Sequence, residues 1–307
     1  MPHAEEANIT GALNFYSSDA WAADQPRKVY LGTVSDKLRK HEPHVVEINN
    51  IRATSNPFTL DQNGFQFVTS PASLAGSDFD NDELVKTVYY AEFENLMKSV
   101  TGASEVHTFG HMIRRNTTLD VRKEAEEVNA KDGPNAFIKR IHPATSCHVD
   151  QSYRGAVNAL QYELPERAEE LMKRRWCIIN IWRPIKPVKR DALVVCDWKT
   201  VDAAKDLVEI DQVLPIPAQH SNYGGTAGQT KVAKPRDIPR WEIAFNPQQK
   251  WYFASDMKPE ECFLIKCFDS SDDGVAKCCP HAAFSRAIDQ GPPRESIEAR
   301  CLVFWDT

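Results

Sequence analysis

The sequence has no apolar stretch long enough to cross a membrane. Its longest uninterrupted apolar runs, such as residues 192–196 and 301–305, are about five residues long, whereas a spanning helix needs about twenty. Basic residues are not in excess either, because Lys and Arg total 37 against 43 Asp and Glu, a net charge of −6. Affinity for nucleic acid rests on clustered positive charge. We therefore expect neither a membrane nor a nucleic-acid partner.

Two further patterns are missing. No Cys-x-x-Cys pair occurs among the eight cysteines, and the N-terminus has no basic segment followed by an apolar one. Without a secretion signal, we expect reduced thiols in a cytoplasmic compartment. Glycine and proline, with 13 and 19 of 307 residues, are at ordinary levels, which excludes a collagen-like or disordered chain.

Short segments rich in β-branched and aromatic residues predict a mainly β protein. These segments are separated by Pro, Asn and Gly, as strands are. We expect strands over residues 29–34, 45–53, 65–69, 176–183, 192–196, 207–214, 241–245, 251–254, 262–268 and 295–304. There is no alternation of strands with helices, so a sandwich or barrel is favoured over a doubly wound parallel sheet.

Two helices accompany the predicted strands. Apolar residues with helical spacing predict the first over residues 84–100, with Asp80 and Glu83 as a capping pair and Gly102 as its end. The second is expected over residues 155–175, with a break near Pro165. We interpret the chain as a single domain over residues 1–307 that starts with an irregular lead-in, residues 1–27. The glycine-containing segment 219–236 is interpreted as either a lid or a plain loop.

The triplet His148-Val149-Asp150 is the first candidate for chemistry. In an extended strand, residues i and i+2 point to the same side, so an imidazole and a carboxylate can converge on one metal ion. His281 is the best candidate for a third ligand, because it lies late in the chain between two predicted strands. Two His and one carboxylate on one face of an octahedral ion leave three positions open, the arrangement of ferrous-iron oxygenases.

Arg294-Glu295-Ser296 supplies a candidate anion site thirteen residues after His281. Arginine and serine at i and i+2 share one side of a strand, and a guanidinium can pair with a carboxylate through two hydrogen bonds. This pattern fits the distal carboxylate of 2-oxoglutarate. Arg300 lies on the same face of the last predicted strand and is the alternative.

These motifs resemble those of a known family. His-x-Asp, a late His and the Arg-x-Ser after it form the signature of ferrous-iron, 2-oxoglutarate-dependent dioxygenases with a double-stranded β-helix (jelly-roll, cupin-like) core. The stretches 106–115, 148–156, 179–197, 280–284 and 294–300 look more narrowly like the fungal gibberellin desaturase-like or AsaB-like hydroxylase/desaturases. The resemblance covers about residue 25 to the C-terminus.

The resemblance implies a mainly β jelly roll with flanking helices that uses Fe(II), 2-oxoglutarate and dioxygen. It implies oxidation of a C–H bond of a small-molecule substrate, by hydroxylation, desaturation or ring closure, within fungal secondary metabolism. The 130 residues between Asp150 and His281 exceed the gap in plant-type enzymes. An insertion at about residues 197–250 would explain this difference. The oligomeric state, including a homo-oligomer, is left open.

Three residues of a predicted strand are candidates for substrate contact. Asn180 and Trp182 would face one way, to bound the substrate or to hold the keto-acid end of 2-oxoglutarate, and Arg183 would face the other way and pair with a substrate carboxylate. The alternative is a buried Trp with an Arg at the rim.

Two alternative interpretations describe a protein without oxygenase activity. Cysteines 262, 267, 278 and 279 together with His281 could hold a structural zinc ion, as in a binding or regulatory module. A cupin-like binding protein would keep the jelly roll but not the 2-oxoglutarate requirement.

Overall fold

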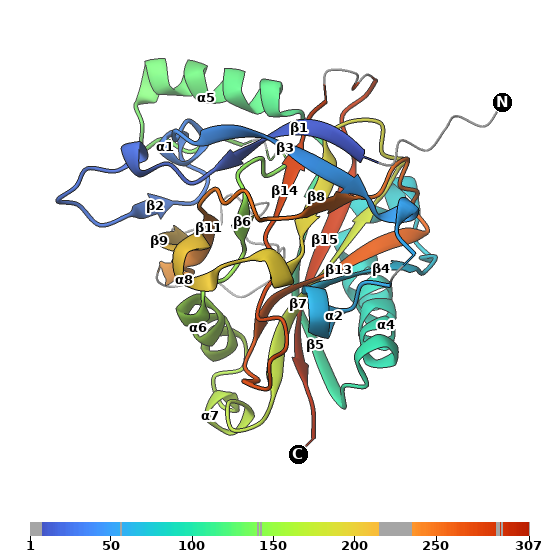
Figure 1. The fold of residues 1–307 in the computed structure, drawn as a ribbon. Helices are drawn as coiled ribbons and strands as arrows, with labels where there is room; N and C mark the ends of the chain where they lie inside the picture. The colour runs from blue at the N-terminus through green and yellow to red at the C-terminus, as the bar shows by residue number, and fades with distance from the viewer. Residues whose placement is uncertain are drawn as a thin grey trace.

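The computed structural model describes residues 8–55, 57–139, 141, 143–214, 235–286, 289 and 291–306. Figure 1 shows the strands gathered in the middle of the molecule, with helices α4 and α6 on different sides of them. The strands form two sheets. No helix in these described ranges is both long and apolar enough to span a membrane.

The larger sheet has the strand order β1-β3-β12-β8-β14-β6-β11-β9-β10, with β2 paired to β9. Its members are β1 Asn8–Phe15, β2 Lys28–Tyr30, β3 Glu42–Asn50, β6 His148–Val149, β8 Ala192–Cys196, β9 Leu207–Leu214, β10 Arg236–Asp237, β11 Arg240–Ile243, β12 Trp251–Phe253 and β14 His281–Phe284. The smaller sheet has the order β4-β13-β7-β15-β5. Its members are β4 Phe65–Thr69, β5 Glu105–Arg114, β7 Trp176–Pro184, β13 Glu261–Asp269 and β15 Ser296–Phe304.

The order in which the chain visits these sheets identifies a jelly roll. Strands β5, β7, β13 and β15 lie in the smaller sheet, and β6, β8, β12 and β14 lie in the larger one, so the chain crosses between sheets at almost every step. The expected fold class is therefore confirmed. Residues 197–250 lie between β8 and β12, and their strands β9, β10 and β11 extend the larger sheet beyond β6.

Successive side chains of β7 point to opposite faces of the sheet, so its apolar residues belong to two different hydrophobic cores. Ile178 and Trp182 belong to the core cluster that also holds residues of the larger sheet, such as Val194 and Trp251. Ile179 and Ile181 belong to a second cluster, shared with Tyr89, Phe93 and Met97. One face of the smaller sheet therefore lines the barrel interior, and the helix that contains α4 covers the other face.

That helix is the first of the two expected from the sequence. It comprises α3 Asp82–Leu84, a π-helical turn η4 Val85–Tyr89 and α4 Tyr90–Thr101. Gly102, with a φ of 68°, ends it as expected, because glycine adopts the left-handed conformation without a steric cost. The predicted cap was wrong: the side chain of Asn81, not Asp80, accepts hydrogen bonds from the first turn.

The remaining helices are short, except α5 with 15 residues and α6 with 11. The second predicted helix is confirmed as α6 Tyr153–Glu163 and α7 Ala168–Leu171, with the break in the expected place. The other α-helices are α1 Val34–Lys37, α2 Leu60–Asn63, α5 Thr118–Asp132 and α8 Ala203–Asp206, and the 3-10 helices are η1 Ser18–Ala20, η2 Ile51–Ala53, η3 Gly76–Asp80 and η5 Trp198–Thr200. The sequence analysis did not predict α5, whose buried face is limited to Val121 and Ala125.

The expectation of an irregular lead-in over residues 1–27 needs correction. Residues 8–15 form β1, which pairs along its whole length with β3. Leu13 and Phe15 of β1 are fully buried, so tertiary packing supplies what the local pattern did not show. Most of the expected lid or loop at 219–236 lies outside the described residues, and its last two residues, 235 and 236, lead into and begin β10.

Candidate active site

Two histidines and one aspartate converge where β6 and β14 meet. His148 and His281 are paired residues in the antiparallel register of these strands. Asp150 follows β6 directly, and potential ligand atoms of all three residues lie within 4.8 Å of one another. This is the only group of at least three potential metal ligands found in the described part of the chain. The structure thus brings together the three residues that the sequence analysis selected.

Backbone carbonyl groups orient both imidazole rings. Nδ1 of His148 donates to the carbonyl oxygen of Ser146 at 2.7 Å, and Nδ1 of His281 donates to that of Cys279 at 3.0 Å. Each ring therefore keeps the lone pair of Nε2 for another partner. Burial lowers the pKa of His148 to about 4, and the nearby His281 contributes to this shift. His148 is consequently neutral at pH 7, which is the form that can bind a metal.

The two oxygens of Asp150 have different surroundings. Oδ1 lies 3.3 Å from Nε2 of His148. Oδ2 accepts a hydrogen bond from Nδ2 of Asn180 at 2.6 Å, and Nε of Arg300 lies 4.0 Å from it. Burial alone would raise the pKa of Asp150, but the close approach of His148 and the Arg300 charge hold that pKa well below its usual range. The carboxylate is held from one side while Oδ1 faces the histidines.

Arg294 and Ser296 lie inside the barrel with incomplete hydrogen bonding. Arg294 is only 4% exposed, its Nη1 donates to the carbonyl oxygen of Asp191 at 2.6 Å, and its guanidinium lies 5.0 Å from the Trp182 ring centroid. Nε of Arg294 and Oγ of Ser296 are buried and have no hydrogen-bond partner among the described residues. Burial and the Arg114 charge lower the pKa of Arg294 to about 9. An anion at this position would satisfy both groups.

Trp182 and Asn180 face the barrel interior, as expected, but Arg183 does not serve the site. Its Nη1 donates hydrogen bonds to the backbone carbonyl oxygen of Ser70 and, at 2.8 Å, to that of Pro259. Its guanidinium lies 5.6 Å from the Tyr89 ring centroid. These contacts give no support to the predicted pairing of Arg183 with a substrate carboxylate. The alternation of β7 places this side chain on the face covered by the helix.

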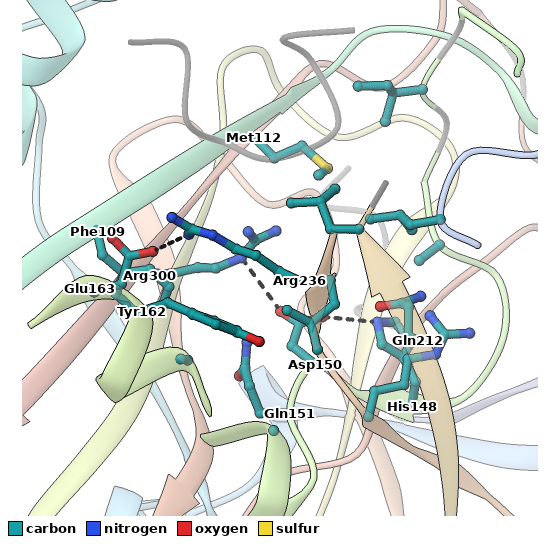
Figure 2. Close-up of a pocket in the computed structure, with 18 of the residues that line it drawn as sticks. Phe109, Met112, His148, Asp150, Gln151, Tyr162, Glu163, Gln212, Arg236 and Arg300 are labelled. Atoms are coloured by element: carbon teal, nitrogen blue, oxygen red, sulfur yellow. Dashed lines mark hydrogen bonds and ion pairs between the residues drawn. The ribbon is translucent and has the colours of Figure 1, made fainter. Parts of the chain in front are cut away.

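A pocket opens beside Asp150 and His148 (Figure 2). Most of the residues that line this pocket were not predicted from the sequence, because they come from elements that are far apart in the chain. They include Phe109 and Met112 of β5, Gln151 just before α6, Tyr162 and Glu163 of α6, Gln212 of β9 and Arg236 of β10. Figure 2 shows Arg300 extending toward Asp150, with His148 and Gln212 on the other side of that carboxylate. The pocket thus gives a small molecule access to His148 and Asp150.

A buried ionic cluster supports β6 from β11. Glu242 is paired with His148 in the register of these strands, and its carboxylate accepts hydrogen bonds from Arg39 and Arg240, at 2.7 Å in each case. Burial alone would raise the pKa of Glu242, but the nearby His41 and the two guanidinium groups hold it well below its usual range. The cluster connects the segment after α1 with β11, the strand that pairs with β6.

The zinc interpretation receives no support from the described residues. All eight cysteines are buried and free, and none belongs to the group of potential metal ligands. Burial raises the pKa of the Cys262 thiol to about 11 and raises that of Cys267 well above its usual value. Thiols with raised pKa values are poor metal ligands, because zinc binds the thiolate.

Comparisons with known proteins agree with this geometry. A family model described as "Oxidoreductase/YMDC permease-like domain" matches residues 13–304. Hydroxylase/desaturase efuI of Hormonema carpetanum is 38% identical over 278 residues, which cover 90% of this chain and 88% of that protein. Hydroxylase/desaturase asaB of Aspergillus flavus is 44% identical over 291 residues, which cover 93% of this chain and 92% of that protein.

A third relative has a solved structure. The Fe(II)/2-oxoglutarate-dependent dioxygenase nvfI of Aspergillus novofumigatus is 28% identical over 268 residues, which cover 85% of this chain and 84% of that protein. The structure of the iron and alpha-ketoglutarate-dependent endoperoxidase NvfI superimposes with a TM-score of 0.74 at 24% identity, over 98% of this chain and 99% of that one. This likeness supports the same fold.

Proposed function

The chain belongs to the fungal hydroxylase/desaturase family of Fe(II)- and 2-oxoglutarate-dependent oxygenases, and we propose that it holds its iron through His148, Asp150 and His281. It is an oxidoreductase that uses Fe(II), 2-oxoglutarate and dioxygen, and we assign it to the oxidation of a C–H bond of a small metabolite in fungal secondary metabolism. The observation that carries this proposal is the convergence of two imidazoles and one carboxylate beside a pocket that His148 and Asp150 line.

The residues present fit a ferrous ion. Two imidazole nitrogens and one carboxylate oxygen are the donors of the facial triad, which leaves positions open for other ligands. The carbonyls of Ser146 and Cys279 fix the tautomers of the two histidines. Asn180 donates a hydrogen bond to Oδ2 of Asp150, and it would thereby orient this carboxylate as a ligand for the metal. This role for Asn180 replaces the contact with substrate or keto acid expected from the sequence.

The residues also fit 2-oxoglutarate. Arg294 and Ser296 would hold its distal carboxylate, since a carboxylate supplies the acceptor that Nε of Arg294 and Oγ of Ser296 lack. It would also neutralise a guanidinium that is almost completely buried. Trp182 supports the guanidinium from one face and so fixes its orientation.

Iron, 2-oxoglutarate and dioxygen together supply the oxidising power that removes hydrogen from the substrate, and 2-oxoglutarate is converted to succinate and carbon dioxide. The protein contributes position: the pocket walls hold one C–H bond of the substrate beside the ligands of β6. Hydroxylation, desaturation and ring closure differ in what happens after the hydrogen is removed. The choice among them depends on which substrate atoms the walls hold close to the metal.

Succinate release tests this proposal. Protein loaded with Fe(II) under anaerobic conditions is mixed with 2-oxoglutarate, oxygen and a panel of fungal metabolites, and succinate and oxidised product are measured together. We expect succinate to form in step with product. Product formed with iron and oxygen but without any keto acid would show an oxidase of similar architecture, and the assignment of Arg294 and Ser296 would then fail.

A further inference from the structure

Two arginines of the last core strand and the turn before it have different surroundings. Arg294 is 4% exposed, lies against Trp182 and Asp191, and does not line the pocket. The Arg300 side chain is 16% exposed and does line it, next to Asp150 (Figure 2). A molecule that enters the pocket therefore meets Arg300 and not Arg294. This difference separates the two arginines that the sequence left as alternatives for one role.

The guanidinium of Arg300 is close to two carboxylates without a close hydrogen bond to either. Nε lies 4.0 Å from Oδ2 of Asp150, and Nη2 lies 3.6 Å from Oε1 of Glu298. Within the part of the chain that the structure describes, Nε of Arg300 and Oε1 of Glu298 are both buried without a hydrogen-bond partner. Under the proposed function, the negative charge of Asp150 is shared with iron. The guanidinium of Arg300 then remains positively charged and can still donate hydrogen bonds to a molecule in the pocket.

Three other basic residues of the pocket have closer carboxylate partners, and the first is Lys37, whose Nζ lies 3.2 Å from Oδ2 of Asp36. Nη1 of Arg236 lies 2.9 Å from Glu163, and Nη2 of Arg240 lies 2.7 Å from Glu242. The rest of the wall includes apolar side chains such as Phe109, Met112, Ile141 and Ile238. The pocket therefore offers an apolar surface with the incompletely compensated guanidinium of Arg300 beside His148 and Asp150, and Arg114 is a further cation of its wall. A matching occupant has an apolar body and one anionic group.

We propose that Arg300 is the specificity-determining residue that binds a carboxylate of the substrate, and that the natural substrate is an apolar metabolite bearing a carboxylate near the oxidised carbon. The inference rests on the proposed function and narrows its substrate class. The planar guanidinium can give two parallel hydrogen bonds to a carboxylate, which fixes both the distance and the orientation of the substrate. Arg294 remains the partner of 2-oxoglutarate, so each arginine serves a different anion.

Binding of matched acids and amides tests the proposal without turnover. The protein is saturated with Mn(II) and 2-oxoglutarate in the absence of oxygen. Calorimetric titrations then compare octanoate, cyclohexanecarboxylate and 1-naphthoate with their primary amides. We expect at least one acid to bind about tenfold or more tightly than its amide, the effect of a charge-assisted hydrogen-bonded pair. Arg300→Gln should abolish this preference, and Arg300→Lys should keep part of it.

Arg236→Gln is the matched control, because it removes a pocket arginine that already has a carboxylate partner. It should keep the preference for the acid. The inference is overturned if no acid is preferred, if Arg300→Gln keeps the preference, if Arg236→Gln loses it equally, or if Arg300→Gln instead weakens 2-oxoglutarate binding. Failure of the wild type to bind Mn(II) and 2-oxoglutarate at all would be a failure of the proposed function, which the same titrations detect separately.

Discussion

His281 lies directly opposite His148 in the antiparallel pairing of β14 and β6. This register position brings two distant parts of the chain together, and their ring centroids are 4.6 Å apart. A shift of one residue in either strand would turn one imidazole to the opposite face of the sheet. The metal site therefore depends on what fixes the register of β6, a strand of only two residues that also pairs with β11.

Loss of a metal ligand should abolish activity. We expect His148→Ala and Asp150→Ala each to lose both bound iron and succinate formation, because each removes one of three protein ligands. Iron per chain after anaerobic loading and desalting measures the first effect, and succinate measures the second. His44→Ala is the control, since His44 stacks on Phe245 and is not part of the ligand group. Normal iron binding by Asp150→Ala would contradict the assignment.

Asn180→Ala should weaken iron binding without abolishing it. Asn180 holds the second oxygen of Asp150, and loss of such a contact lowers metal affinity by about 10- to 100-fold. Competition with a chelator measures this change. Asn63→Ala removes a comparable buried amide–carboxylate hydrogen bond, from Asn63 to Asp197 at 3.0 Å, outside the site. It should reduce stability but leave iron affinity unchanged, so equal effects on iron in both variants would argue against a role for Asn180.

Arg294→Ala should keep the fold and the iron but raise the 2-oxoglutarate requirement sharply. Loss of a charged hydrogen-bonding partner of a buried carboxylate costs about 2–5 kcal/mol, which is about 30-fold to several thousand-fold in affinity. Arg294→Lys should recover only part of this loss, because an ammonium group cannot reproduce the two parallel hydrogen bonds. The dependence of succinate formation on 2-oxoglutarate concentration measures both.

Arg300→Ala is the internal control for Arg294, since it removes the other arginine that faces the barrel. Its 2-oxoglutarate requirement should stay close to that of the wild type. A large effect in Arg300→Ala with a small one in Arg294→Ala would exchange the roles of the two arginines. The family membership would survive that result.

Much of this site could be predicted because its residues obey local rules. Strand spacing put His148 and Asp150 on one side, and it placed Asn180 and Trp182 opposite to Arg183. Strand spacing does not show which face of β7 a helix covers, so it could not show that Arg183 lies against Tyr89 of that helix. The pocket walls escaped prediction because they combine residues from β5, α6, β9 and β10, whose proximity depends on tertiary structure.

Errors in the predicted fold have similar causes. Strands β4, β8 and β9 were predicted with their observed ends, since each is a clear β-branched or aromatic segment between turn residues. Helix α5 was missed because it packs only two buried residues, although its capping box of Thr117 and Asp120 and its end at Gly133 were visible signals. Strand β1 contains Asn and Gly and is stabilised by pairing with β3, which no local pattern reveals.

Glu242→Gln should lower stability at neutral pH and flatten its dependence on acid. The folded-state pKa of Glu242 is lowered, so its contribution to the free energy of unfolding is present above its unfolded value of about 4.3 and is lost as pH falls below that value. Removing the carboxylate leaves Arg39 and Arg240 unpaired in a buried site, at a cost of about 3–5 kcal/mol. Chemical denaturation between pH 7 and pH 3 measures both effects.

A matched exposed variant controls for the general effect of acid. Asp202→Asn changes a carboxylate that pairs with Lys205 at the surface, so it should change stability little at pH 7. If the wild type and Glu242→Gln show the same loss of stability between pH 5 and pH 3, the buried cluster does not contribute to acid sensitivity.

The central claim is that His148, Asp150 and His281 hold a ferrous ion on which 2-oxoglutarate turnover depends. The most direct test strips the protein of metal, reloads it with either Fe(II) or Zn(II), and measures succinate formed from 2-oxoglutarate in the presence of oxygen. Zinc suits the same ligands but has no redox chemistry. We predict succinate only from the Fe(II)-loaded protein and none from Asp150→Ala. Succinate formation at the full rate after complete removal of iron would contradict the account.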